Sequence, residues 1–143
     1  MKEKQFLFVY GSLKKGFRNH RYLKDGQYPF TYEGPAITVG SFAMKGNGYY
    51  PVVFRDENIA SVLGELYSFS ADACLSRVDQ LEGHPTFYQR TPETVETFDG
   101  NRIVAWMYAM EREPVDWALN TRGVRLHTTV KNKPILEWVK TID

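Results

Sequence analysis

Residues 5–13 read Gln-Phe-Leu-Phe-Val-Tyr-Gly-Ser-Leu and combine the clearest strand of the chain with an abrupt turn. The apolar run that ends at Tyr10 is typical of a strand buried on both faces. Glycine at position 11 lets the backbone turn so that the N–H groups of Gly11, Ser12 and Leu13 point into one concavity. Such a concavity would bind a carboxylate or a developing oxyanion. The alternative interpretation is an ordinary turn from strand to loop.

Further strands are expected in the first half of the chain. Residues 50–54 and 61–69 are rich in apolar and β-branched residues. Gly64, inside the second of these, marks a bend or a close approach of another backbone. Residues 30–44 also have strand character, but glycine and proline interrupt them.

A hairpin is predicted in the second half of the chain. Residues 88–98 and 102–110 have the pattern of two antiparallel strands, and Asp99-Gly100 between them is a strong turn signal. Short strands with hairpins and glycine bends indicate a closed or nearly closed sheet. The sequence therefore predicts an α+β fold, a small mixed β-barrel with few flanking helices.

Residues 70–82 form the clearest predicted helix. Ser70 is a suitable N-cap, apolar residues recur at helical spacing, and Gly83 follows where glycine commonly ends a helix. Glu82 lies four residues after Val78, on the apolar face. Partial burial and the negative end of the helix dipole would both raise its pKa toward that of a general base near neutral pH. The alternative is a helix-end glutamate that points into water.

Two tyrosines are candidates for the same pocket. Tyr88 begins a strand just after the helix, so its hydroxyl can lie near Glu82. Tyr50 belongs to a glycine- and tyrosine-rich loop at 46–51 that could cover a site. Arg90 is expected to pair with a carboxylate, for example that of Glu93 or Glu65. Plain structural roles are the alternative for each of these residues.

The composition limits the classes of function. The chain has 143 residues, which predicts one domain over residues 1–143, and its net charge of +1 is too small for a general nucleic-acid binder. Its single cysteine, Cys74, excludes an internal disulfide and cysteine-rich zinc sites. Without a signal peptide or a membrane-spanning run, we expect a cytoplasmic protein, a monomer or weak homodimer that binds neither nucleic acid nor membrane.

A local basic cluster follows the glycine turn. It is either a solvated loop leading to a helical turn near residues 20–23 or a positive rim that attracts an anionic small molecule. Its members are Lys14, Lys15, Arg18, Arg21 and Lys24.

Other kinds of chemistry have weaker support. Ser12 lacks the G-x-S-x-G context of a nucleophilic serine. His20, His84 and His127 form no pair at metal-binding helical spacing, so we expect no metal site.

The apolar residues that follow Pro134 predict a short terminal helix.

Two motifs resemble a known family. Val-Tyr-Gly-Ser-Leu-Lys-Lys-Gly at 9–16 with Asn19-His20, and Leu-Glu-Gly-His-Pro-Thr-Phe-Tyr-Gln-Arg at 81–90, are similar to the paired signatures of the gamma-glutamylcyclotransferase-like family, nearest to its gamma-glutamylamine cyclotransferase branch. The resemblance spans about residues 5–112, and the tail at 113–143 is unassigned. Arg18 stands where that branch often has proline.

The resemblance implies a function and the residues that perform it. It implies release of 5-oxoproline from a gamma-glutamyl compound, without metal or organic cofactor, and with Glu82 as the proton-transferring residue. The implied substrate cradle is Tyr10, Gly11, Ser12 and Leu13. Two alternatives stay open: a cyclotransferase that acts on another gamma-glutamyl compound, and a noncatalytic binding or interaction module on the same barrel.

Overall fold

The computed structural model describes residues 4–17, 19–24, 30–47, 50–70, 73–84, 87–114, 117–130 and 133–139. Three sets of residues discussed above lie outside this part: Arg18 of the basic cluster, residues 48–49 of the loop at 46–51, and residues 71–72 near the predicted helix start. The elements are β1 (Gln5–Val9), α1 (Arg21–Lys24), β2 (Thr31–Thr38), β3 (Ala43–Gly46), β4 (Pro51–Phe54), β5 (Ser61–Phe69), α2 (Ala73–Glu82), β6 (Gln89–Thr97), β7 (Arg102–Ala109), β8 (Val124–Val130) and β9 (Lys133–Trp138).

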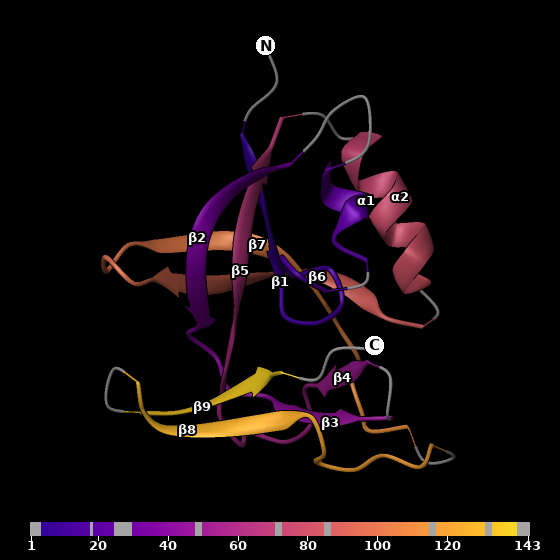
Figure 1. Ribbon diagram of the computed structural model, residues 1–143, viewed down its shortest axis with the longest axis vertical. Coiled ribbons are helices and arrows are strands. Elements are labelled where there is room, and N and C mark those ends of the chain that lie inside the picture. Colours follow the sequence, from indigo (N-terminus) through magenta and orange to yellow (C-terminus); the bar gives the residue numbers. More distant parts are fainter. Residues whose placement is uncertain are drawn as a thin grey trace.

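Five strands close into the predicted mixed barrel. Their order is β1-β7-β6-β2-β5, and β5 pairs again with β1. The barrel is mixed because β1 runs antiparallel to β5 but parallel to β7. Figure 1 shows α1 and α2 together at one side of this barrel, and a contact between Arg77 and Tyr22 joins them. The predicted α+β class is thereby confirmed.

Strand β1 is buried on both faces, as its apolar run predicts. Leu7 and Val9 belong to the core cluster that also contains the apolar residues of α2. Phe8 and Tyr10 belong to the second core cluster, because successive side chains of a strand point to opposite faces. A Cβ atom at Gly64 of β5 would lie 2.3 Å from the carbonyl oxygen of Val9, so the predicted close approach is confirmed.

The predicted hairpin forms from β6 and β7, which pair antiparallel from Gln89↔Ala109 to Glu96↔Arg102. Gly100 has φ 94° and its N–H donates to the Thr97 carbonyl at 3.0 Å. The turn therefore uses a backbone conformation that favours glycine.

The prediction of a terminal helix is wrong. The residues after Pro134 form strand β9, which pairs antiparallel with β8 and parallel with the start of β5. Ile135 and Leu136 lie opposite Ser61 and Val62 of β5, and these ladder partners, distant in sequence, override the helix-like spacing of the apolar residues. Proline is tolerated near the beginning of the strand.

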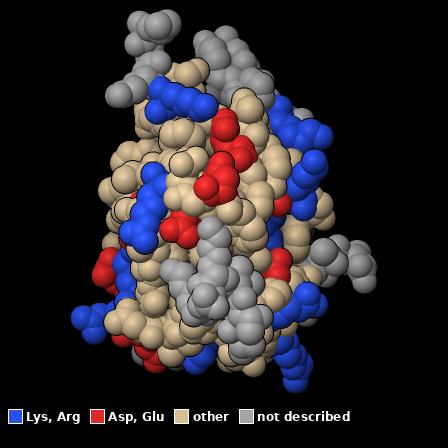
Figure 2. Space-filling model, turned by 90° about the vertical axis from the view of Figure 1, so that its left-hand side faces the viewer, with Lys and Arg blue, Asp and Glu red and all other residues tan. Residues whose placement is uncertain are grey.

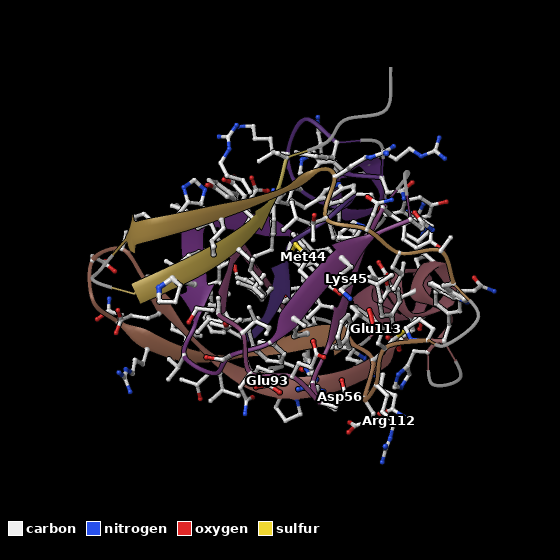
Figure 3. All side chains as sticks on the ribbon, turned by 90° about the horizontal axis from the view of Figure 1, so that it is seen from below. Met44, Lys45, Asp56, Glu93, Arg112 and Glu113 are labelled. Carbon is white, nitrogen blue, oxygen red and sulfur yellow. The ribbon has the colours of Figure 1, made fainter. Side chains whose placement is uncertain are left out.

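Ion pairs connect the end of the molecule that carries β3 and β4 to neighbouring segments of the chain. Lys45 of β3 binds Glu113, with 2.6 Å between Nζ and Oε1, and both residues are labelled in Figure 3. Arg55, next to β4, pairs with Glu93 of β6. On the molecular face opposite the helices, Figure 2 shows charges of both signs interspersed among the described residues.

Candidate active site

Helix α2 ends at Glu82 with its apolar face against the barrel. Leu75 and Val78 are buried on that face, and Glu82 follows one turn after Val78. Gly83 has φ 69° and so ends the helix as predicted. The backbone then turns back, because the Tyr88 N–H donates to the Glu82 carbonyl at 3.3 Å. Glu82 is thereby held at the junction of α2 and β6.

Glu82 opens into a cavity of about 750 Å³ between the barrel and the helices. All seven residues that the sequence singles out line it, from four separate segments of the chain. They are Tyr10, Gly11, Ser12, Leu13, Tyr50, Glu82 and Tyr88. The same cavity is lined by residues that the sequence analysis did not identify as site residues, notably Asn19, Tyr22, Pro51, Gln80, Phe87 and Tyr108.

The surroundings of the Glu82 carboxyl are unusual for a glutamate. Burial raises its pKa to about 7, and its position at the C-terminal end of a helix acts in the same direction. No residue in the described part of the chain forms a hydrogen bond or ion pair with that carboxylate, so nothing there offsets the cost of burying its charge. A carboxyl group of this kind exists in both protonation states near neutral pH, as a general acid and base requires.

Tyrosine hydroxyls close the inner wall of the cavity. Tyr10 donates to the Tyr108 carbonyl at 2.5 Å, and Tyr88 donates to the Pro51 carbonyl at 2.8 Å. Burial, and to a smaller extent the charge of Glu82, raises the pKa of both Tyr10 and Tyr88 well above the usual value. These hydroxyls therefore stay neutral, and they fix the shape of the wall.

The turn after β1 is held by its own hydrogen bonds. The Lys14 N–H donates to the Gly11 carbonyl at 3.0 Å, and Asn19 binds the Ser12 hydroxyl and carbonyl at 2.9 and 2.8 Å. The N–H groups of Gly11, Ser12 and Leu13 have no hydrogen-bond acceptor among the described residues. These donors stand beside the cavity, and they are available to a ligand.

Gly11 is also required by packing. A Cβ atom there would lie 2.7 Å from Cγ of Pro51, which is too close for any real contact. The turn at Gly11 therefore packs closely against Pro51, the residue whose carbonyl accepts the Tyr88 hydroxyl bond.

Arg90 pairs with a carboxylate, as predicted, but its partner is Asp79 rather than Glu93 or Glu65. Its Nε and Nη2 atoms donate to the two carboxylate oxygens of Asp79 at 2.8 and 3.1 Å. Tyr108 adds a hydroxyl bond of 2.5 Å to the same carboxylate. Asp79 lies three residues before Glu82, so helical spacing could have placed it near the site, but its partners come from the distant strands β6 and β7.

The basic cluster does not act as one unit. Lys14 is only 5% exposed, and its Nζ donates to the Trp138 carbonyl of β9 at 2.6 Å, so it fastens the turn to the C-terminal strand. Lys15, whose backbone N–H binds Glu65, is exposed. Of the described members, only Arg21 lines the cavity.

His84 and His20 each bind a backbone group. His84 Nδ1 accepts the Arg90 N–H at 3.0 Å, so this nitrogen is occupied by the turn after α2. His20 binds the Leu13 carbonyl at 2.9 Å. Within the described residues, no group of three His, Cys, Asp or Glu side chains is arranged to hold a metal ion.

Among the described residues, no helix has the length and apolar character needed to cross a membrane.

Known proteins resemble this chain in sequence and in fold. The family model described as gamma-glutamyl cyclotransferase, AIG2-like, matches residues 7–127. A Methanocaldococcus jannaschii protein named for the same family is 39% identical over 105 residues, which cover 73% of this chain and 82% of the relative. The human gamma-glutamylaminecyclotransferase is 29% identical over 138 residues, with 78% and 82% of the two chains covered. The crystal structure of an AIG2-like protein from Mus musculus superposes with a TM-score of 0.72 at 27% identity, over 80% of this chain and 82% of that one. The chain therefore belongs to the gamma-glutamyl cyclotransferase, AIG2-like family.

Proposed function

We propose that this family member is a gamma-glutamylamine cyclotransferase-like enzyme, which releases 5-oxoproline and a free amine from a gamma-glutamyl amine. The proposal rests on Glu82, a carboxyl group in a cavity, with a pKa of about 7 and no compensating partner among the described residues. A pure binding module gains nothing from such a group, because its burial costs free energy.

The reaction needs one group that moves a proton twice. Glu82 takes a proton from the α-ammonium of the substrate, and the freed α-amino nitrogen attacks the γ-carbonyl carbon. A new C–N bond closes the five-membered ring, and the carbonyl oxygen carries the negative charge. The attack leaves the ring nitrogen with two hydrogens and a positive charge. Glu82 then gives its proton to the leaving nitrogen and takes the second proton from the ring nitrogen, while the original amide C–N bond breaks and the carbonyl re-forms. Glu82 passes this second proton to the released amine, which departs as an ammonium, and the carboxylate is regenerated. Atoms and charges balance without metal or cofactor.

The turn after β1 binds the oxygen atoms of the substrate. Gly11, Ser12 and Leu13 line the cavity, and their N–H groups have no acceptor among the described residues, so they can stabilise charge on a substrate oxygen there. Because attack is intramolecular, holding the glutamyl chain curled supplies much of the rate. A structure with 5-oxoproline bound away from these N–H groups would contradict this assignment.

A second candidate is a cyclotransferase for another gamma-glutamyl compound. A relative from Niallia circulans, 31% identical over 116 residues, is named as a cyclotransferase of gamma-L-glutamyl-butirosin B. The same glutamyl end would occupy the same inner cavity in either case, and only the leaving amine would differ.

The test is direct. Purified protein is incubated with gamma-glutamyl-ε-lysine and, separately, with glutathione, and 5-oxoproline is measured by mass spectrometry. We expect release from the lysine compound and little from glutathione. Glu82→Gln is the control for contaminating activity. Absence of 5-oxoproline from every gamma-glutamyl compound tried, with intact folded protein, would favour the noncatalytic binding module.

A further inference from the structure

Asn19 is joined to Ser12 by two hydrogen bonds. Its backbone N–H donates to the Ser12 carbonyl at 2.8 Å, and its side-chain Nδ2 donates to the Ser12 hydroxyl oxygen at 2.9 Å. Asn19 is itself anchored, because its carbonyl accepts the Tyr22 N–H of α1 at 3.0 Å. Leu23, the next residue of that helix, is buried in the core. Asn19 therefore connects Ser12 to a packed element of the fold.

The direction of the side-chain bond decides what the Ser12 hydroxyl can do. An amide nitrogen donates hydrogen bonds and accepts none, so Ser12 Oγ is the acceptor of this bond. The proton of the hydroxyl must then point to another acceptor. None of the described residues accepts it, and both Ser12 and Asn19 line the cavity that contains Glu82. The hydroxyl proton is thus available to an oxygen atom of a bound ligand.

The backbone of the turn does not depend on the Asn19 side chain. The Leu13 carbonyl binds His20 Nδ1 at 2.9 Å. The Ser12 carbonyl is held by the backbone N–H of Asn19, which every residue except proline supplies. A change confined to the Asn19 side chain therefore removes the amide beside the Ser12 hydroxyl and leaves these backbone bonds in place.

From these contacts we infer that Asn19 is a positioning residue, which fixes the Ser12 hydroxyl as a hydrogen-bond donor to an oxygen of the glutamyl group. The inference rests on the proposed cyclisation, which places that group between Glu82 and the turn after β1. A hydroxyl without a partner rotates freely, and only some of its orientations aim the proton at the substrate. A hydroxyl that already accepts the Asn19 amide has lost most of that freedom, so its donation to the substrate requires less ordering.

Three variants separate the amide from the hydroxyl. Ser12→Ala removes the donor, so kcat/KM for gamma-glutamyl-ε-lysine should fall about fivefold to thirtyfold. Asn19→Ala leaves the hydroxyl free to rotate, so kcat/KM should fall about threefold to tenfold. Asn19→Asp should lower kcat/KM at least as much as Ser12→Ala does, because a carboxylate only accepts hydrogen bonds and would take the Ser12 proton for itself.

A double-mutant cycle tests whether Asn19 acts through Ser12. In a Ser12→Ala background, Asn19→Ala should change kcat/KM by less than about twofold, because the hydroxyl that the amide orients is gone. A general loosening of the turn would instead lower kcat/KM by the same factor in both backgrounds. Asn101→Ala is the matched control and should leave kcat/KM unchanged. Asn101 is exposed, its Nδ2 donates to Asp99 in the β6–β7 turn, and it lies outside the cavity lining.

The two levels of the proposal fail differently. If Asn19→Ala cost the same factor in both backgrounds, or if Asn19→Asp kept wild-type kcat/KM, the role of Asn19 would be overturned and the cyclisation would stand. If the wild-type protein released no 5-oxoproline from any gamma-glutamyl compound, the cyclisation would be contradicted. Calorimetric binding of 5-oxoproline would then decide the role of Asn19. Weaker binding to Ser12→Ala and Asn19→Ala than to wild type would support that role, and an equal or undetectable affinity in all three would overturn it.

Discussion

The last two turns of helix α2 contain two carboxylates in opposite surroundings. Asp79 is bound by both donor atoms of the Arg90 fork and by the Tyr108 hydroxyl. Glu82, three residues later, lies in the cavity with no hydrogen bond or ion pair from the described residues, and burial raises its pKa to about 7. The same chemical group is therefore ion-paired at Asp79 and, by our proposal, the proton carrier at Glu82.

The difference lies in which strands reach each carboxylate. Arg90 and Tyr108 lie opposite each other on β6 and β7, so the hairpin presents both donors to Asp79 at once. The chain around Glu82 instead offers tyrosines whose hydroxyls already donate to backbone carbonyls. We expect mutations at Asp79 to affect stability first and mutations at Glu82 to affect turnover first.

The largest expected effect is the loss of turnover in Glu82→Gln. Glutamine keeps the shape of the side chain but cannot take the proton from the substrate, and a general acid–base group typically contributes about 10²–10⁴-fold. Turnover is measured as 5-oxoproline release, with circular dichroism as the check on folding. A variant that retained more than about a tenth of wild-type turnover would exclude Glu82 as the main base.

Asp79→Asn should show the opposite profile. The substitution removes the ion pair with Arg90 and leaves that guanidinium partly buried, which should cost about 1–3 kcal/mol of unfolding free energy. Urea denaturation measures the loss, and a double-mutant cycle with Arg90→Gln isolates the pair. If Asp79→Asn instead lost turnover as severely as Glu82→Gln while its unfolding free energy was unchanged, Asp79 would have to be counted among the proton-transfer groups.

The sequence predicts the residues of the candidate site where local patterns define their positions. The position of Glu82 follows from helical spacing and from Gly83, and the turn at Gly11 follows from the end of an apolar run. The partners of Asp79 and Lys14 could not be predicted, because they depend on strands far away in the chain. Lys14 and Trp138, for example, are 124 residues apart. The helix predicted after Pro134 fails for the same reason, because ladder partners on β5 decide the conformation of β9.

Lys14→Met extends the comparison to the turn that faces Glu82. Loss of the hydrogen bond from Nζ to the Trp138 carbonyl should cost about 1 kcal/mol, since the desolvation of a buried ammonium, which also lowers the pKa of Lys14, offsets part of the bond. A looser turn should also raise KM about twofold to fivefold, with kcat changed less. Lys15→Met, at an exposed neighbour, is the control. Equal effects of the two variants would show that the bond to β9 does not position the turn.

The smallest expected effect is the net change in stability at pH 8, where Glu82→Gln should be neutral or mildly stabilising. The pKa of Glu82 is about 7 in the folded protein and about 4.3 in the unfolded chain. Below pH 4 both states are protonated, so the wild-type carboxyl carries no penalty. Between pH 4 and pH 7 the unfolded state loses its proton while the folded state keeps it, and wild-type stability falls toward its full penalty above pH 7. The buried amide of the variant has its own desolvation cost at every pH, so the net gain at pH 8 should be only about 0–1 kcal/mol.

The informative quantity is therefore the difference in unfolding free energy between variant and wild type at pH 4, 5.5, 7 and 8. This difference should shift in favour of glutamine as the pH rises and level off above pH 7. A difference that shifted the other way would mean that favourable partners stabilise the ionised Glu82, as they do Asp79, and the contrast between the two carboxylates would disappear.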